Sequence, residues 1–173
     1  MHQLTAILRR ALFAVAVAAA TLTSLVPAHA GALSDYLENK LVDHLFRSTS
    51  YTAPTTWYVA LFTSSCSDSA GGTEVSGGSY ARASLASGTS NWANTQASGT
   101  GASTGTSGTT SNSSAITFAT PSAGWGTVTH WGLYDASSAG NLLVCSPLTV
   151  SKTINSGDSV SFGIGALTVQ IDN

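Results

Sequence analysis

Charged residues, catalytic motifs and cysteines are all scarce in this chain. Only 8% of its 173 residues are charged, and the formal net charge is −2. The six basic residues form no patch, which argues against nucleic acid as a partner. There is no G-x-S-x-G turn, no H-E-x-x-H helix and no P-loop. The eight acids are scattered, so the facing carboxylate pair of a glycosidase is missing too. We therefore expect a protein without enzymatic activity.

Histidine is also rare, since only His44 and His130 occur beyond the first thirty residues. A Ser-His-Asp triad can be drawn from His130, Asp135 and one of many serines, but so many serines make the match uninformative. Asp43 and His44 are neighbours on a predicted helix and point about 100° apart, which favours a solvated rim over an acid–base pair. We expect His130 to be a packed or hydrogen-bonded strand residue. No catalytic, cofactor-binding or metal-binding residue is assigned.

The chain has two cysteines, Cys66 and Cys145. An even number of cysteines in an exported protein favours one disulfide, here closing a loop of about 80 residues worth about 4 kcal/mol in the chain-entropy model. Two separate buried thiols are the alternative. A metal site is disfavoured, because isolated thiols lack the paired spacing of zinc sites.

Residues 1–30 have the pattern of a secretory signal peptide. Arg9 and Arg10 precede the ten-residue apolar run at 11–20, and a small-x-small box ends at Ala30, which predicts cleavage between Ala30 and Gly31. A membrane anchor is the alternative, but a spanning helix needs roughly 20 apolar residues. Cleavage leaves 173 − 30 = 143 residues with four basic and eight acidic side chains, a net charge of 4 − 8 = −4. We expect export through the bacterial inner membrane, an extracellular location and no stable membrane insertion.

Residues 34–47 carry the clearest helical pattern. An apolar stripe recurs every four residues, at Leu33, Leu37, Leu41 and Leu45. Ser34 is placed to cap the helix, with Asp35 in the first turn and Arg47 in the last. One amphipathic helix is therefore expected at the start of the exported chain.

The remainder predicts short strands separated by turns. In the segment 55–65 both faces are apolar, with Trp57, Val59 and Leu61 on one and Tyr58, Ala60 and Phe62 on the other. Such a strand is expected to be central and covered on both sides. About seven to eight strands indicate a mainly β fold. We expect a single domain over residues 31–173: an antiparallel β-sandwich of jelly-roll or immunoglobulin-like type with the N-terminal helix at one end or edge.

The segment GWGTVTHWGLYD, residues 124–135, is the chemically richest of these strands. Alternation places Trp125, Thr127, Thr129, Trp131 and Leu133 on one face and Val128, His130 and Tyr134 on the other. Gly126 and Gly132 leave room for close neighbours or a bulge. Pro147 is expected to interrupt the following strand region, and Gly165 to mark a bulge near the C-terminus.

Residues 87–114 consist almost entirely of Ser, Thr, Gly, Ala and Asn. Such a segment buries too little apolar surface to fold alone, so it is predicted to be a mobile loop or a polar edge hairpin. Trp92 is its one large side chain and the candidate for stacking on a ligand. An exposed recognition loop and a solubilising insertion both remain open.

The motifs LSDYLENKLVDHLFRSTSYTAPTTWYVALFT, GTEVSGGSYAR, NSSAITFAT, WGTVTHWGLYDA, GNLLVCSPLT and KTINSGDSVSFGIGALTVQID follow one another along the chain. In this order they resemble the small structural proteins of tailed phages that are described as tail-fibre or virion proteins. The resemblance spans residues 32–172. It implies a non-enzymatic, β-rich module that acts in several copies and needs no cofactor.

Two features depart from that phage pattern: the leader, and the cysteines at 66 and 145. They indicate a phage-like module that a bacterium uses outside the cell. We expect a homo-oligomer or polymer, forming an extracellular fibre or sheath through exposed strand edges, with residues 31–34 and 168–173 freest to exchange. One alternative is a secreted adhesin or carbohydrate-binding module that contacts a cell-surface glycan through Trp92. A second alternative is a genuine phage virion protein.

Overall fold

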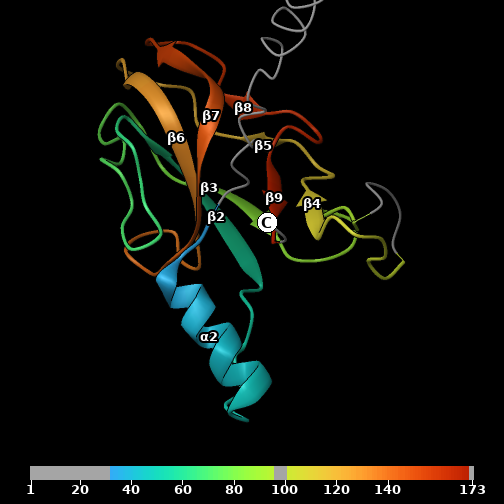
Figure 1. Cartoon of the computed structure of the whole chain (residues 1–173). Coiled ribbons are helices and arrows are strands. Elements are labelled where there is room, and N and C mark those ends of the chain that lie inside the picture. Colours follow the sequence, from blue (N-terminus) through green and yellow to red (C-terminus); the bar gives the residue numbers. More distant parts are fainter. Residues whose placement is uncertain (1–31, 96–100, 172–173) are drawn as a thin grey trace, which may run out of the picture.

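The computed structural model describes residues 32–95 and 101–171 of the chain. The predicted leader, including the cleavage position between Ala30 and Gly31, lies outside the described residues. The elements run in the order β1 (Ala32–Leu33), α2 (Asp35–Phe46), β2 (Thr56–Phe62), β3 (Ala83–Ala86), β4 (Thr109–Ser111), β5 (Ile116–Thr117), β6 (Gly126–Tyr134), β7 (Leu142–Ile154), β8 (Ser161–Phe162) and β9 (Thr168–Gln170) (Figure 1). Within the described ranges, no helix is both long and apolar enough to cross a membrane.

The main element of the fold is an antiparallel sheet in the order β1-β7-β6-β2-β3. β2 lies between β6 and β3, so both of its edges are hydrogen-bonded. Val59 and Leu61 belong to the larger of two buried clusters, and Ala60 and Phe62 to the smaller. The expectation of a central strand with two apolar faces is thereby confirmed.

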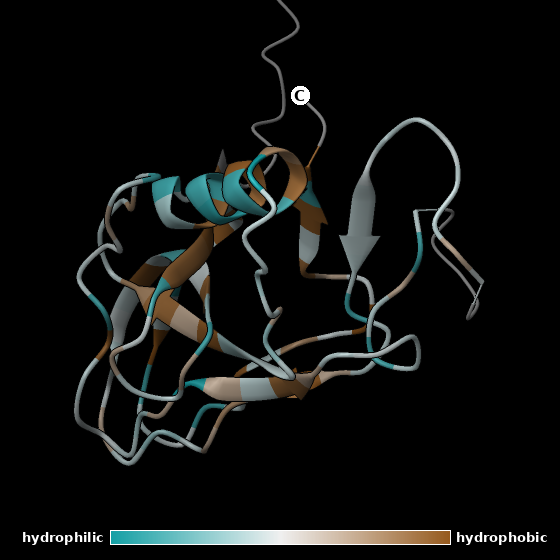
Figure 2. Ribbon diagram, turned by 90° about the horizontal axis from the view of Figure 1, so that it is seen from below, coloured by the Kyte–Doolittle hydropathy of each residue, from teal (hydrophilic) through white to brown (hydrophobic). Residues whose placement is uncertain are grey.

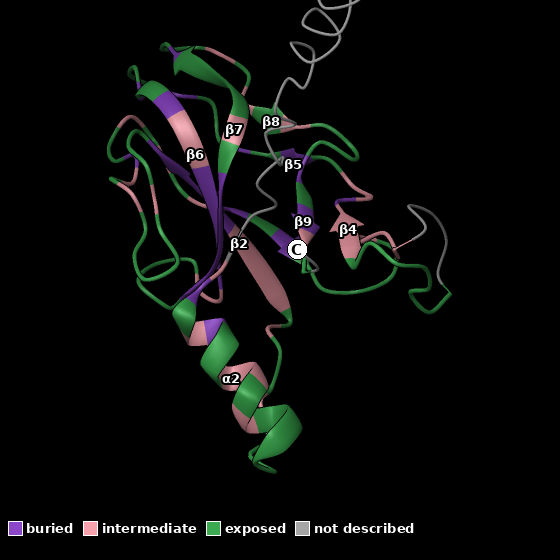
Figure 3. Cartoon of the chain, in the orientation of Figure 1, coloured by how far each residue is buried: buried purple, intermediate pink, exposed green. Residues whose placement is uncertain are grey.

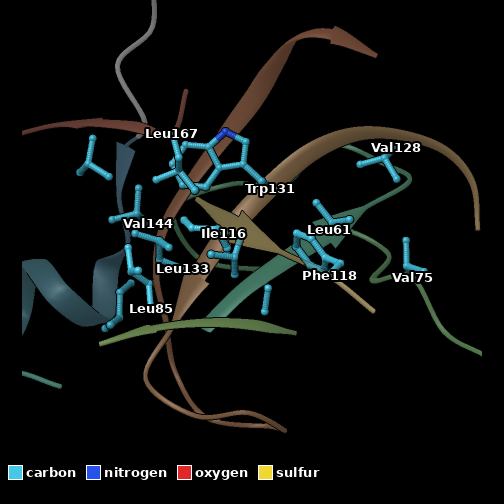
Figure 4. Close-up of a cluster of buried hydrophobic side chains, with 14 of the residues drawn as sticks. Leu61, Val75, Leu85, Ile116, Phe118, Val128, Trp131, Leu133, Val144 and Leu167 are labelled. Atoms are coloured by element: carbon cyan, nitrogen blue, oxygen red, sulfur yellow. The ribbon is translucent and has the colours of Figure 1, made fainter. Parts of the chain in front are cut away.

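The larger cluster lies between this sheet and a second layer formed by two short ladders, β4–β9 and β5–β8. Figure 4 shows how the side chains of the two layers meet, with Ile116 and Leu167 from the ladders against Trp131, Leu133 and Val144 from the sheet. The predicted mainly β, antiparallel architecture with one helix is confirmed. Its second layer is made of short paired segments, because β4, β5, β8 and β9 are only two or three residues long.

The smaller cluster lies on the opposite face of the sheet and contains Phe62, Tyr134, Leu142 and Cys145. Gly132 allows this packing: a Cβ there would lie 2.8 Å from the Phe62 ring and 2.9 Å from a Leu142 methyl group. The close approach that was expected at Gly132 is therefore present.

Three local expectations were wrong. Val128 faces the larger cluster together with Trp131, because a register shift between Val128 and His130 breaks the alternation. Pro147 does not end β7, which runs from Leu142 to Ile154 and pairs Pro147 with His130, although its pairing with β6 shifts register between Pro147 and Lys152. Gly165, with a φ of +74°, lies in a turn that separates β8 from β9 where a bulge was predicted.

The helix begins and ends as the sequence predicts. The Ser34 side chain accepts a hydrogen bond from the Leu37 amide at 3.2 Å and donates one to the Leu142 carbonyl, so the cap also joins the helix to β7. Leu37 is buried, but the C-terminal half of α2 projects away from the sheet (Figures 1 and 3). The helix is therefore buried most deeply at its first turns.

In its described parts, residues 87–95 and 101–114, the polar segment is more than a loop. It contains β4, which pairs with β9, and a bridge joins Trp92 to Asn112. β4 is drawn in pale, weakly hydrophilic colours in Figure 2, as its sequence Thr-Thr-Ser requires. Its pairing is set by the partner strand β9, which brings Val169 into the core.

Candidate functional site

An apolar cavity of about 200 Å³ lies beside the base of the helix. It is lined by Ile171 and by residues from the helix, the sheet and the segments around the β4–β9 ladder, namely Leu37, Trp57, Trp92, Leu133, Val144 and Val169. Thr110 is the polar side chain in this wall, and its hydroxyl already donates to the Ala93 carbonyl at 2.6 Å. The cavity therefore suits an apolar occupant.

Trp92, the predicted stacking residue, forms part of that wall. Its ring meets Trp57 edge-on, with 5.9 Å between ring centroids and 63° between planes, and it is half-buried. Its indole N–H is buried and has no hydrogen-bond partner among the residues that the structure describes. Trp92 is thus a cavity wall with one unsatisfied donor, and its ring is not an open platform on a polar loop.

A polar groove of about 380 Å³ lies on the other side of β4. Its wall combines the apolar side chains of Ala93 and Ile164 with hydroxyl- and amide-bearing residues, namely Asn94, Thr95, Thr109, Ser111, Asn112 and Thr168. The Asn112 side chain is itself engaged: its amide donates to the carbonyls of Ser114 and Gly163, both at 2.8 Å, and its oxygen accepts from the Leu167 amide at 2.9 Å. This asparagine thus joins the polar segment to the start of β9.

The strongest electrostatic contact is a partly buried network around Arg82. Its guanidinium binds both oxygens of Glu74, at 2.9 and 2.8 Å, and the carbonyls of Ala136 and Ala139, at 2.9 and 2.8 Å. It also stacks 3.6 Å above the Tyr134 ring. Burial alone would lower the pKa of Arg82, but the hydrogen bonds and charge of Glu74 outweigh it and raise that pKa above its ordinary value. Four of the five guanidinium N–H groups make these hydrogen bonds, and the two to Ala136 and Ala139 hold the 135–141 turn against the sheet.

Tyr80 extends this network into the larger core. Its hydroxyl donates to Glu74 and accepts from the Leu61 amide, both at 3.0 Å. Burial raises the pKa of Tyr80 well above its ordinary value. No sequence pattern predicted the network, because the residues hydrogen-bonded to Arg82 lie 8 to 57 positions away from it in the chain. A lone arginine within an otherwise weakly charged strand region was the one available signal.

The acid–base candidates are not brought together. His130 is half-buried and bonds to the neighbouring Thr129 hydroxyl at 2.9 Å, as expected for a packed strand residue. Asp135 binds the Asn141 backbone and side chain, both at 2.7 Å, and so shapes a turn.

The helical pair is likewise separated. Asp43 pairs with Arg47 at 2.8 Å, while His44 accepts from the Tyr51 amide at 3.2 Å. Among the described residues, no group of three or more His, Cys, Asp or Glu side chains is placed to hold a metal ion.

Cys66 and Cys145 form a disulfide, with 6.3 Å between their Cα atoms and 79 positions between them in sequence. Cys145 lies in β7 opposite Ala32 of β1, and Cys66 lies in the segment after β2. The bridge joins this segment to the smaller buried cluster, as the disulfide hypothesis predicted.

The comparisons with known proteins agree with this architecture. No curated protein sequence matches the chain. A family model described as the podophage GP4 fiber I protein gp80 matches residues 32–170, from β1 to the last residue of β9. A match over that range includes both layers, the helix and the cavity, and it leaves the predicted leader outside. The chain therefore belongs to the family of podophage GP4 fiber I protein gp80.

Proposed function

We propose that this protein is a non-enzymatic structural subunit that associates with further copies of itself into a fibre or sheath. The observation that carries the proposal is the family match over residues 32–170. The surface supports it: Val42, Leu45 and Phe46 expose 49%, 67% and 81% of their area on the projecting end of α2. Apolar clusters of this kind on a soluble protein mark sites of association.

Association through strand exchange is less well supported than the sequence suggested. Ala32–Leu33 is paired with β7, and Thr168–Gln170 is paired with β4, within a single chain. Exchange would first have to break those ladders. The outer edge of β7 beyond Cys145 pairs with no other strand in the described part of the chain, and it includes Val150 with 67% of its area exposed. Strand addition at this edge is the competing mode of assembly.

Electron microscopy of purified protein and of culture supernatant tests the proposal. We expect elongated or ordered multimers, whose proportion rises with protein concentration. Analytical ultracentrifugation gives the matching solution measurement. A monomer at every concentration, with no particles in either sample, would contradict self-association.

We further propose that the subunit acts outside the cell after removal of residues 1–30. N-terminal sequencing of the released protein is expected to begin at Gly31. Replacing both Ala28 and Ala30 with arginine should block the small-residue cleavage box and retain the uncut chain in the cell. If cells that express the unaltered sequence release the protein with residues 1–30 still attached, the proposed cleavage is contradicted.

A second candidate function is binding of a glycan in the polar groove, favoured by its hydroxyl- and amide-rich wall. Thr95→Ala and Thr168→Ala probe that wall directly. Trp92→Ala tests the cavity that the tryptophan actually lines. Glycan-array binding that is lost in the groove variants and kept in Trp92→Ala would support this function, and no binding by the unaltered protein would remove it.

A further inference from the structure

We propose that Phe46 of one copy inserts into the apolar cavity beside Trp57 and Trp92 of a second copy. The inference rests on the self-association proposed above and names its interface. It brings together two features of the molecule: the exposed apolar ring of Phe46 and an apolar cavity of matching size.

The projecting feature is the end of α2. Phe46 is the most exposed of its large hydrophobic residues, at 81%, and Leu45 and Val42 flank it. Figure 3 shows this end of the helix as largely exposed, and Figure 1 shows it standing away from the sheet. The ring is therefore free to enter another molecule without rearranging its own.

The hole has the size and the chemistry for that ring. A dry apolar cavity of about 150 Å³ is large enough to bind benzene, and this one measures about 200 Å³. Two tryptophans in the wall offer edge-to-face contacts to an entering aromatic ring.

Phe46 cannot reach the cavity of its own chain. Leu37 lines the cavity, and Phe46 follows it by nine residues on the same helix. Nine residues span about 13.5 Å along the axis and turn the side chain by about 180°. Ring and cavity therefore lie at opposite ends and on opposite sides of α2, so the contact must join two copies. A contact between unlike patches that does not close on itself propagates into an open filament.

Charge favours a second copy over an unrelated apolar partner. The end of the helix that carries Phe46 also carries Arg47, whose side chain is 69% exposed and is paired through Nε with Asp43. The end beside the cavity carries Asp35 and Glu38, also exposed. When the Phe46 end of one copy docks beside the cavity of another, Arg47 comes close to Asp35 and Glu38 at the rim of the contact. This attraction helps to orient the two copies.

The test uses the full chain, expressed with residues 1–30 and purified as the cell releases it. Its association is followed by sedimentation. Phe46→Ser should weaken association by about 10- to 100-fold, the equivalent of losing one buried aromatic side chain. Ile164→Ser removes a similarly exposed residue, 73% accessible, which lines the polar groove and not the cavity, and it should leave association unchanged. Val169→Phe fills the cavity from within and should weaken association like Phe46→Ser, provided that its circular dichroism shows a native fold.

A photo-crosslinking benzoylphenylalanine at position 46 locates the contact even if the cavity variant fails to fold. Crosslinks to Val169 or Ile171 of a second copy are the expected result. Association that survives Phe46→Ser and is lost in Val150→Lys would overturn this inference, and would assign assembly to the β7 edge. An unaltered protein that stays monomeric would instead overturn the proposed self-association itself, so the two failures are distinguishable.

Discussion

Replacing Asn112 with alanine should destabilise the domain by more than its place in a Ser/Thr-rich segment suggests. The side chain is 1% exposed and makes three hydrogen bonds, to the Ser114 and Gly163 carbonyls and from the Leu167 amide. Alanine removes all three and leaves the Leu167 N–H buried without a partner, because Leu167 has no exposed area.

The expected cost follows from those contacts. An unsatisfied buried donor costs about 1–3 kcal/mol, and each lost hydrogen bond to a carbonyl adds about 0.5–1.5 kcal/mol. We expect a loss of about 3 kcal/mol, which is a large part of the 5–15 kcal/mol that usually holds a domain together. With a urea slope of about 1–3 kcal/mol per molar, the unfolding midpoint should fall by about 1–3 M.

Equilibrium urea unfolding, followed by tryptophan fluorescence, measures the change. Asn141→Ala is the matched control, because Asn141 is exposed and its side chain makes a single hydrogen bond, to Asp135 at 2.7 Å. That variant should lose less than about 1 kcal/mol. Equal midpoints for the two variants would refute the reasoning that the Asn112 side chain joins the polar segment to β9.

Three further perturbations test other parts of the fold. Reducing the disulfide between Cys66 and Cys145 should lower stability by about 4 kcal/mol, measured as a lower melting temperature in dithiothreitol, and an unchanged melting temperature would contradict the chain-entropy argument. Gly132→Ala should cost about 1–3 kcal/mol, because its Cβ would overlap a buried phenylalanine ring, whereas Gly163→Ala meets open space and should stay within about 1 kcal/mol. Above pH 10 the unfolded chain loses the Tyr80 proton that the folded chain keeps, so stability should fall by up to about 1.4 kcal/mol per pH unit, and Tyr80→Phe should lessen that slope in urea unfolding.

Local patterns predicted the parts of this fold that local physics determines. The four-residue leucine spacing and the Ser34 cap placed the helix at 34–47, and it spans Asp35–Phe46. Strict alternation assigned the two faces of β2, because a side chain in a paired strand has only two directions available. The same rule failed at Val128, since a register shift depends on the facing strand and leaves no mark on the strand that contains it.

Long-range contacts account for the rest. β4 has no strand pattern of its own and exists because β9 pairs with it. Trp92 was predicted to stand alone in a polar loop, but it packs on Trp57, 35 positions earlier in the chain. The Arg82 network and the Asn112 side chain likewise connect segments that are distant in sequence. The free energy of each of these contacts depends on which distant segments of the chain pack together, and the composition of a segment does not say which partner it will meet.

The scarcity of charge bears directly on assembly. Arg82, whose side chain is 7% exposed, is used inside the molecule to hold a turn, and Asp135 shapes that same turn. Much of the remaining surface is hydroxyl-bearing or small. Burying such a surface in an interface takes few charged side chains out of water. The desolvation cost that opposes association therefore stays low. A small apolar contact, such as the projecting ring at Phe46, can then decide whether two copies bind.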